Sequence, residues 1–331
     1  MGTGSYRASR RTFLQAAAAG VLVPALAAAE RTLAARSLTG AAVPAGFSLV
    51  DAHIHLWDLS EFPVPWIAGN AILNKSYVLQ DYKDQSAGLG IGAIVYVQAA
   101  VANEYSLLEA DYIADLAAND PLVTGMVAYA PLEYGEQARV YLDSLMTRGS
   151  VVKGIRRGLP DPTDSTFDMN RFIQGIQILP EYGLSFDILG KGTPHMDMAI
   201  RIAQQAPGTS LIIDHLLKPF IKERQLEPWR AKMTQLASFP NVSTKISGIA
   251  TEADLMNWST EDLKPYVDHA LSAFGEDRVV FGGDWPPILT ANSTYARWVQ
   301  TLDELTSGMG AAGQRKLFGD NARSFYRLSA A

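Results

Sequence analysis

Eight short runs rich in β-branched and other apolar residues, separated by stretches of helical length, constrain the fold of this chain more than any other feature. The run at 91–97 is apolar at nearly every position, which is typical of a parallel strand covered on both faces. Eight strand-plus-helix units in about 280 residues predict an α/β fold, the closed (β/α)₈ TIM barrel. The runs lie at 49–57, 91–99, 122–130, 151–157, 184–189, 210–216, 242–247 and 279–281.

An open, doubly wound sheet is the alternative to the barrel. Nucleotide-binding sheets of that kind carry a G-x-G-x-x-G motif after the first strand, and this chain has none there. The segment 59–75, which contains Pro63, Pro65 and Trp66, is too long for an ordinary connection between a strand and a helix. We expect this segment to fold over the mouth of the barrel, the end at which the strands terminate.

The first 29 residues have the pattern of an export signal. Arg10 and Arg11 lie in a Ser-Arg-Arg-Thr-Phe-Leu segment that resembles a twin-arginine signal, and an apolar stretch with small residues follows it. That stretch is shorter than the roughly 20 strongly apolar residues of a membrane span, so we expect no permanent membrane anchor. The sequence thus predicts a signal at 1–29, a tether at 30–46 and one domain at 47–331. It also predicts a periplasmic or secreted protein that uses the twin-arginine export machinery.

Composition narrows the choice of partners and chemistry. The formal net charge is -6, which does not suggest nucleic acid as a partner, so we expect a small-molecule substrate. The chain contains no cysteine, which excludes disulfides, thiolate nucleophiles and thiolate metal ligands.

The strongest chemical signal is the pair His53 and His55 at the end of the first predicted strand. Side chains alternate along a strand, so both imidazoles point to the same side, and the end of a barrel strand places them in the mouth. His215 and Asp284 end the sixth and eighth runs in the same way. Two glycines precede Asp284 and allow its backbone to approach a neighbour closely. Imidazoles with one carboxylate form a set suited to activating water.

Taken together and in order, the motifs of the chain resemble the amidohydrolase superfamily. The similarity is greatest to the amidohydrolase-related (amidohydrolase 2) family, in the branch of sugar lactonases and pyrone-dicarboxylate lactonases. This resemblance implies a (β/α)₈ hydrolase in which His53, His55, His215 and Asp284 occupy the family's active-site positions. The segments that carry it include D-A-H-I-H-L-W-D at 51–58, K-G-I-R-R-G at 153–158, I-D-H-L-L-K-P at 213–219, K-I-S-G at 245–248 and F-G-G-D-W-P at 281–286.

The chain departs from the binuclear members of that superfamily in its metal ligands. The fourth strand offers no bridging acid, Lys153 lies at the wrong end of its strand, and the fifth strand has Asp187 where a histidine is usual. We therefore expect no metal cofactor. A single zinc remains the alternative, held by His53, His55 and Asp284, with His195 as a further candidate ligand.

Further residues are candidates for binding the substrate. Arg156 and Arg157 end the fourth strand, so one of them must face the mouth, where a guanidinium would hold a carboxylate or a ring oxygen. The other reading for each is a surface ion pair with Asp161 or Asp164. Gln98, Asp187 and Lys245 fall at similar positions on other strands. Trp57, Trp66 and Trp285 lie around the motifs and are placed to stack on a sugar ring.

These features favour hydrolysis of a small sugar or carboxylated lactone. Asp284 would take a proton from water, and the imidazoles would donate hydrogen bonds to the ring carbonyl. Two alternatives stay open: a zinc-dependent nonoxidative decarboxylase of an aromatic or unsaturated acid, and a noncatalytic periplasmic binding barrel.

The export signal can be tested directly. Replacing Arg10 and Arg11 together by lysine keeps the charge but removes the guanidinium pair that the export receptor reads. We expect the precursor to remain in the cytoplasm, as measured by fractionation and the mass of the N-terminus. An unchanged yield of processed periplasmic protein would refute the twin-arginine assignment.

Overall fold

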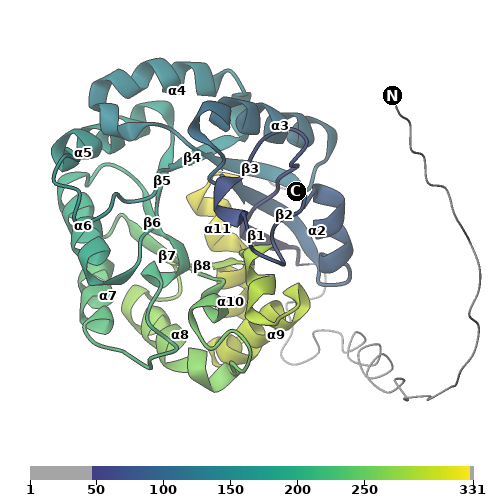
Figure 1. Ribbon diagram of the computed structural model, residues 1–331. Helices are drawn as coiled ribbons and strands as arrows, with labels where there is room; N and C mark the ends of the chain where they lie inside the picture. Colours follow the sequence, from purple (N-terminus) through teal and green to yellow (C-terminus); the bar gives the residue numbers. More distant parts are fainter. Residues whose placement is uncertain (1–46, 329–331) are drawn as a thin grey trace, which may run out of the picture. The chain divides into compact units, whose positions relative to one another are not determined.

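The computed structural model describes residues 47–328, so the predicted signal and tether lie outside the described residues. Eight parallel strands follow one another in chain order around one axis, and helices alternate with them on the outside (Figure 1). The predicted TIM barrel is confirmed. Each predicted run contains one strand, and most runs extend past the strand end because the chain stays apolar as it enters the mouth. The strands are β1 (Leu49–Ile54), β2 (Ile91–Val97), β3 (Val123–Ala128), β4 (Val152–Arg156), β5 (Ser185–Ile188), β6 (Leu211–Ile213), β7 (Val242–Ser247) and β8 (Val279–Gly282).

Side-chain caps mark the starts of some of the described helices. Asp168 accepts hydrogen bonds from two backbone amides at the start of α5, and Ser259 forms a capping box at the start of α8. The described helices are α2 (Leu79–Ser86), α3 (Ser106–Asn119), α4 (Arg139–Met146), α5 (Met169–Gln177), α6 (Gly192–Gln205), α7 (Trp229–Ala237), α8 (Thr260–Phe274), α9 (Tyr295–Thr306), α10 (Gly310–Arg315) and α11 (Asn321–Phe325).

The barrel closes where β1 meets the end of β8. The amide of Asp284 donates to the His53 carbonyl at 2.7 Å, and a side chain on either preceding glycine would prevent this approach. A Cβ at Gly282 would lie 2.7 Å from the Cβ of His53, and one at Gly283 would lie 2.3 Å from Oδ2 of Asp51. The expected close approach at the two glycines is confirmed. It brings β1, which carries His53, into contact with the end of β8, which leads to Asp284.

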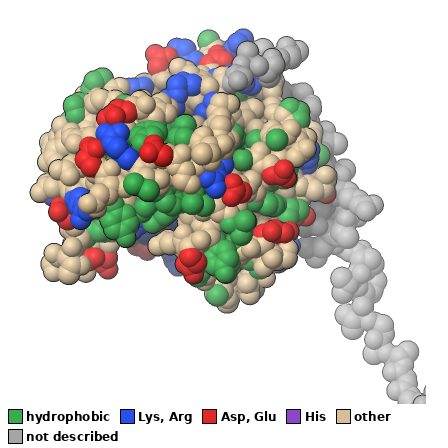
Figure 2. All heavy atoms as spheres, turned by 90° about the horizontal axis from the view of Figure 1, so that it is seen from above, with side chains coloured by type: hydrophobic (Ala, Val, Ile, Leu, Met, Phe, Trp, Pro, Cys, Tyr) green, Lys and Arg blue, Asp and Glu red, His purple; other side chains and the backbone are tan. Residues whose placement is uncertain are grey.

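The C-terminal segment covers the opposite end of the barrel. Arg327, just after α11, donates a hydrogen bond to the carbonyl of Lys153 near the start of β4, at 2.9 Å. Lys153 therefore lies at the end of the barrel away from the mouth, as the sequence indicated. Figure 2 shows acidic and basic side chains interspersed over one face of the molecule. Within residues 47–328, no helix is long and apolar enough to cross a membrane.

Asp51 braces the junction between β1 and β8 from inside the protein. Its carboxylate accepts hydrogen bonds from the amides of His53 (3.1 Å) and Gly283 (2.7 Å), and from the hydroxyls of Tyr82 (3.1 Å) and Tyr295 (2.6 Å). Burial raises the pKa of Asp51 to about 6, although these four donors oppose the shift.

The raised pKa predicts how stability depends on pH. Because the folded state binds the proton of Asp51 more tightly than the unfolded state, this stabilising contribution is complete below pH 3.8 and disappears as the pH rises through about 6. The contribution is on the order of 2–3 kcal/mol for a shift of this size. We expect the free energy of unfolding, taken relative to Asp51→Asn, to fall between pH 4 and 6 in denaturant titrations. If the difference in the free energy of unfolding between the parent and Asp51→Asn stays constant over this pH range, the raised pKa of Asp51 would be refuted.

Candidate active site

A cavity of about 350 Å³ opens at the C-terminal ends of the strands, where TIM-barrel active sites lie. This volume suits a small ligand. Trp66, Asn70 and Leu73 form part of its wall, which confirms that the long segment after β1 folds over the mouth. The ionisable groups of the lining are His55, Arg156, His215, Lys218, Glu252 and Asp284.

The structure brings the three predicted imidazoles and the predicted carboxylate together. The ring of His53 lies 5.0 Å from that of His55 and 4.5 Å from that of His215, between centroids. Asp284 Oδ1 lies 3.5 Å from His55 Nε2 and 3.9 Å from His53 Nε2, and Oδ2 lies 3.8 Å from His215 Nδ1. Among residues 47–328, Asp284 is thus the carboxylate that faces all three rings.

The partners of each imidazole determine which nitrogen carries the hydrogen. His55 Nδ1 lies 2.7 Å from the Val97 carbonyl and His215 Nδ1 lies 3.0 Å from the Ser247 carbonyl. A carbonyl only accepts hydrogen bonds, so Nδ1 of His55 is protonated; Nδ1 of His215 also lies 2.9 Å from the Ser247 hydroxyl, which can donate to it. Burial lowers the pKa of all three imidazoles, which are therefore neutral at neutral pH, and Nε2 of His55 is an acceptor. The expectation that it donates a hydrogen bond to a substrate carbonyl is therefore wrong for His55.

Asp284 remains ionised in spite of its burial. Burial alone would raise its pKa, but the positive charge that His215 carries when protonated and a hydrogen bond from protonated His55 favour the carboxylate, and the net effect is a pKa below the ordinary range. The residue adopts a left-handed backbone conformation, with φ of 50°. Gly248 lies against it, and a Cβ at that glycine would lie 2.2 Å from Asp284 Oδ2. The absence of a side chain at Gly248 therefore makes room for the carboxylate.

His215 begins an unusual turn after β6. Residues 215–218 all have positive φ, between 50° and 57°, which amounts to one turn of left-handed helix without a glycine. Such a conformation costs about 1–2 kcal/mol for each residue and is found where the surrounding structure enforces it, often at functional sites. The turn directs His215 and Lys218 into the cavity, whereas Leu216 and Leu217 are fully buried.

Below the imidazoles lies a set of fully or almost fully buried charges. Asp214 Oδ2 lies 3.4 Å from the Arg156 guanidinium, and its Oδ1 lies 3.0 Å from Lys245 Nζ and 3.3 Å from His53 Nδ1. Lys245 also contacts Asp187 at 2.5 Å. Burial would raise the pKa of Asp214, but Lys245 and His53 lower it, so this carboxylate is charged. We call these residues, Arg156, Asp187, Asp214 and Lys245, the buried charge cluster.

One group of side chains has the geometry for a single metal ion. Ligand atoms around tetrahedral zinc lie on the order of 3.4 Å apart, close to the separations of Asp284 Oδ1 from the Nε2 atoms of His55 and His53. The acceptor state of His55 Nε2 also suits a cation. The Arg156 guanidinium, however, lies 3.3 Å from His53 Nε2 and competes for the same lone pair. The donors therefore fit one zinc ion, with an affinity weakened by Arg156.

Several predicted substrate-binding residues do not line the cavity. Trp57 and Trp285 are completely buried and pack edge-to-face against Tyr77, so the expected stacking on a sugar ring is wrong for them. Arg157 forms an ion pair as its alternative reading expected, but the partner, at 3.2 Å, is Glu133 and not Asp161 or Asp164.

Other predicted residues support the site from behind. Asp187 and Lys245 are fully buried one layer below the cavity and do not face it. Gln98 holds the loop after β2 through Ala100 and donates to the Arg156 carbonyl at 3.4 Å. His195 lies on α6 with its ring nitrogens close to the backbone carbonyls of residues 191 and 160, and it belongs to neither group of candidate metal ligands among the described residues.

Sequence reasoning missed three residues of this region: Asp214, Lys218 and Glu252. Asp214 and Lys218 are part of the same motif as His215, so their position in the sequence was a usable signal. Glu252 follows β7 by five residues, and no pattern in the sequence marks it.

A TIM barrel with a histidine and aspartate site at its mouth defines a class of hydrolases, and comparison with known proteins places the chain within it. A family model described as Amidohydrolase matches residues 50–328, and the chain belongs to this family. An L-fucono-1,5-lactonase from Burkholderia ambifaria is 29% identical over 289 residues, which cover 84% of this chain and 95% of that protein.

Solved structures are similar over the same region. An amidohydrolase from Burkholderia multivorans, crystallised with bound zinc, superposes with a TM-score of 0.76 at 26% identity, over 85% of this chain and all of that one. A 2,6-dihydroxybenzoate decarboxylase from Rhizobium superposes with a TM-score of 0.55 at 15% identity, over 85% of this chain and 98% of that one, and shares the fold.

Proposed function

We propose that this protein hydrolyses a small lactone. The observation that carries the proposal is the ionised Asp284 at the mouth of the barrel, facing the acceptor Nε2 of His55 in a cavity of about 350 Å³. The similarity to an L-fucono-1,5-lactonase over most of both chains supports a cyclic ester as the substrate. We also propose that the enzyme acts in the periplasm or outside the cell, on the basis of its N-terminal twin-arginine pattern.

Two neighbouring hydrogen-bond acceptors, His55 Nε2 and Asp284 Oδ1, suit the activation of water. A water molecule between His55 Nε2 and Asp284 Oδ1, which lie 3.5 Å apart, can donate one hydrogen to each. Its oxygen lone pairs then point toward the substrate. As the water attacks the ring carbonyl, Asp284 accepts its proton as general base.

The developing negative charge on the carbonyl oxygen needs a donor, and Arg156 is the cation deepest in the lining. Its guanidinium is held from behind by Asp214 and Gln98, and its Nε is buried with no hydrogen-bond partner within residues 47–328. We assign to Arg156 the stabilisation of the oxyanion in place of the imidazoles. Collapse of the tetrahedral intermediate breaks the ring ester bond, and protonated Asp284 returns the proton to the leaving alkoxide.

Zinc bound by His53, His55 and Asp284 would lower the pKa of the water and polarise the ester carbonyl. The decarboxylase alternative requires a firmly bound metal. The Arg156 guanidinium beside His53 argues against tight binding of a metal ion, so we favour a hydrolysis that does not depend on metal.

Replacing the proposed base is the most direct test. Asp284→Asn keeps the size of the side chain, and we expect the turnover of L-fucono-1,5-lactone to fall by about 10²–10⁴-fold with little change in binding. Because the pKa of Asp284 is lowered, protonation of this carboxylate should reduce the parent's rate only below pH 3.8, and Asp284→Asn should lack that step. The exposed Asp164→Asn serves as control. Parent-like turnover in Asp284→Asn would refute the mechanism.

Chelation tests the role of metal. We expect dialysis against a strong chelator to remove zinc, measured by elemental analysis, and to leave at least roughly half of the hydrolytic activity, because Arg156 competes for a ligand. Complete loss that zinc alone restores would show that the metal is required. Release of carbon dioxide from 2,6-dihydroxybenzoate, without lactone hydrolysis, would favour the decarboxylase. No turnover of either compound would favour a noncatalytic barrel.

A further inference from the structure

Three loops of the barrel mouth are tied together at Glu252. This residue ends the turn η7 (Ile249–Glu252) after β7, and its side chain is 8% exposed on the cavity wall. Lys191, from the loop after β5, contacts Oε2 at 2.6 Å, and Lys218, from the turn after β6, lies 3.8 Å from Oε1. At 3.8 Å, Lys218 and Glu252 attract each other without a direct hydrogen bond, so both can still bond to a ligand.

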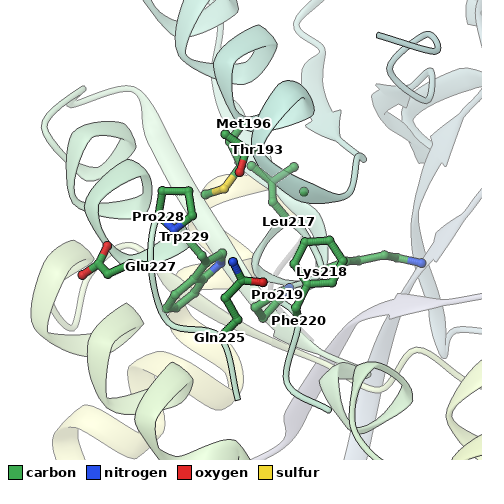
Figure 3. Close-up of a pocket in the computed structure, with 11 residues that line it drawn as sticks. Thr193, Met196, Leu217, Lys218, Pro219, Phe220, Gln225, Glu227, Pro228 and Trp229 are labelled. Atoms are coloured by element: carbon green, nitrogen blue, oxygen red, sulfur yellow. The ribbon is translucent and has the colours of Figure 1, made fainter. Parts of the chain in front are cut away.

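The left-handed turn after β6 accounts for the position of Lys218. In Figure 3, Lys218 extends away from the apolar side chains around Met196, Leu217 and Trp229. The indole of Trp229 donates to the Leu216 carbonyl at 2.8 Å and so holds the turn in place. A lysine that served only for solubility would not require four consecutive residues in a strained conformation.

The charges of the lining indicate the kind of ligand that the cavity accepts. Arg156 and Lys218 are balanced by Glu252 and Asp284, so the lining has no net formal charge when the imidazoles are neutral. The terminal nitrogens of Arg156 already face His53, Asp214 and the Gln98 carbonyl, and the donor that remains is the one assigned above to the ester oxyanion. A carboxylate elsewhere on the ligand would therefore find Lys218 as its main cation and would meet the carboxylates of Glu252 and Asp284.

Trp66 supplies an apolar surface in the same cavity. The residue is 46% exposed, and its indole nitrogen donates to the Ala99 carbonyl at 2.6 Å, which fixes the orientation of the ring. An oriented aromatic face next to a paired cation and carboxylate matches the two sides of a sugar ring, since its C–H groups are apolar and its hydroxyls both donate and accept hydrogen bonds.

We propose that Lys218 and Glu252 form a hydroxyl-binding subsite and that, with Trp66, they select a neutral, polyhydroxylated lactone over a carboxylated one. Lys218 donates to one ring hydroxyl and Glu252 accepts from a neighbouring hydroxyl. Lys191 holds Glu252 in the orientation that this requires. The inference rests on the proposed lactone hydrolysis.

Two lactones that differ in their hydroxyl groups test the subsite. L-Fucono-1,5-lactone carries ring hydroxyls, and δ-valerolactone has the same ring size without them. For Lys218→Met and Glu252→Gln we expect KM for the hydroxylated lactone to rise on the order of tenfold, with kcat/KM for δ-valerolactone unchanged. Lys222→Met, an exposed lysine of the same loop, should match the parent on both compounds.

Other kinetic outcomes would overturn the proposal. Equal losses on both lactones would show that the two residues only support the turn that carries His215. Parent-like kinetics in both variants would show that they do not contact the substrate. A parent enzyme that prefers 2-pyrone-4,6-dicarboxylate to the neutral lactone would refute the selectivity.

A binding measurement separates this inference from the proposed function. Calorimetry with L-fucose, a neutral pyranose with no ester to hydrolyse, reports on the subsite alone. We expect the parent and Lys222→Met to bind it and both cavity variants to bind it on the order of tenfold more weakly. This result in a protein that hydrolyses no lactone would keep the subsite and refute the hydrolysis. Equal binding by all four proteins would refute the subsite.

Discussion

The active site depends on the pairing of charges inside the barrel. Asp214 lies between Arg156 and Lys245, and Lys245 also reaches Asp187, all within 3.4 Å and almost entirely removed from water. Buried charges are tolerated only when they are paired, because an unpaired charge of this kind costs about 3–5 kcal/mol. Each member therefore fixes the position of the next. The cluster contacts His53 through Asp214, Lys245 and Arg156, and so orients the central imidazole of the site.

The same cluster links the two ends of the barrel. Tyr326, from the C-terminal segment that covers the N-terminal ends of the strands, donates a hydrogen bond to Asp187 at 2.9 Å. Lys245 lies 5.4 Å above the ring of this tyrosine. A chain of direct contacts thus runs from Tyr326 through Asp187 and Lys245 to His53. In TIM barrels the N-terminal end is associated with stability and the C-terminal end with chemistry, and here the two are in physical contact.

The fold and the central site were predictable because both depend on local patterns. Eight apolar runs indicated the barrel, and the alternation of side chains placed His53 and His55 on one side of β1. The alternation of side chains also required that only one of Arg156 and Arg157 faces inward, without showing which one. Alternation does not reveal how far along the barrel axis an inward side chain lies. Asp187 and Lys245 are fully buried and do not line the cavity, although Asp187 pairs in register with Arg156, which does.

What the sequence did not reveal is concentrated where the backbone is least ordinary. Lys218 enters the cavity through a left-handed turn, and no rule for L-residues predicts four consecutive positive φ angles. Asp284 also has positive φ, next to a glycine that leaves room for its carboxylate. Both segments follow directly after strands of a closed barrel, whose hydrogen bonds and packed core hold them in place. The regular part of the protein, which a sequence specifies well, thus stabilises short irregular segments that present the reactive groups.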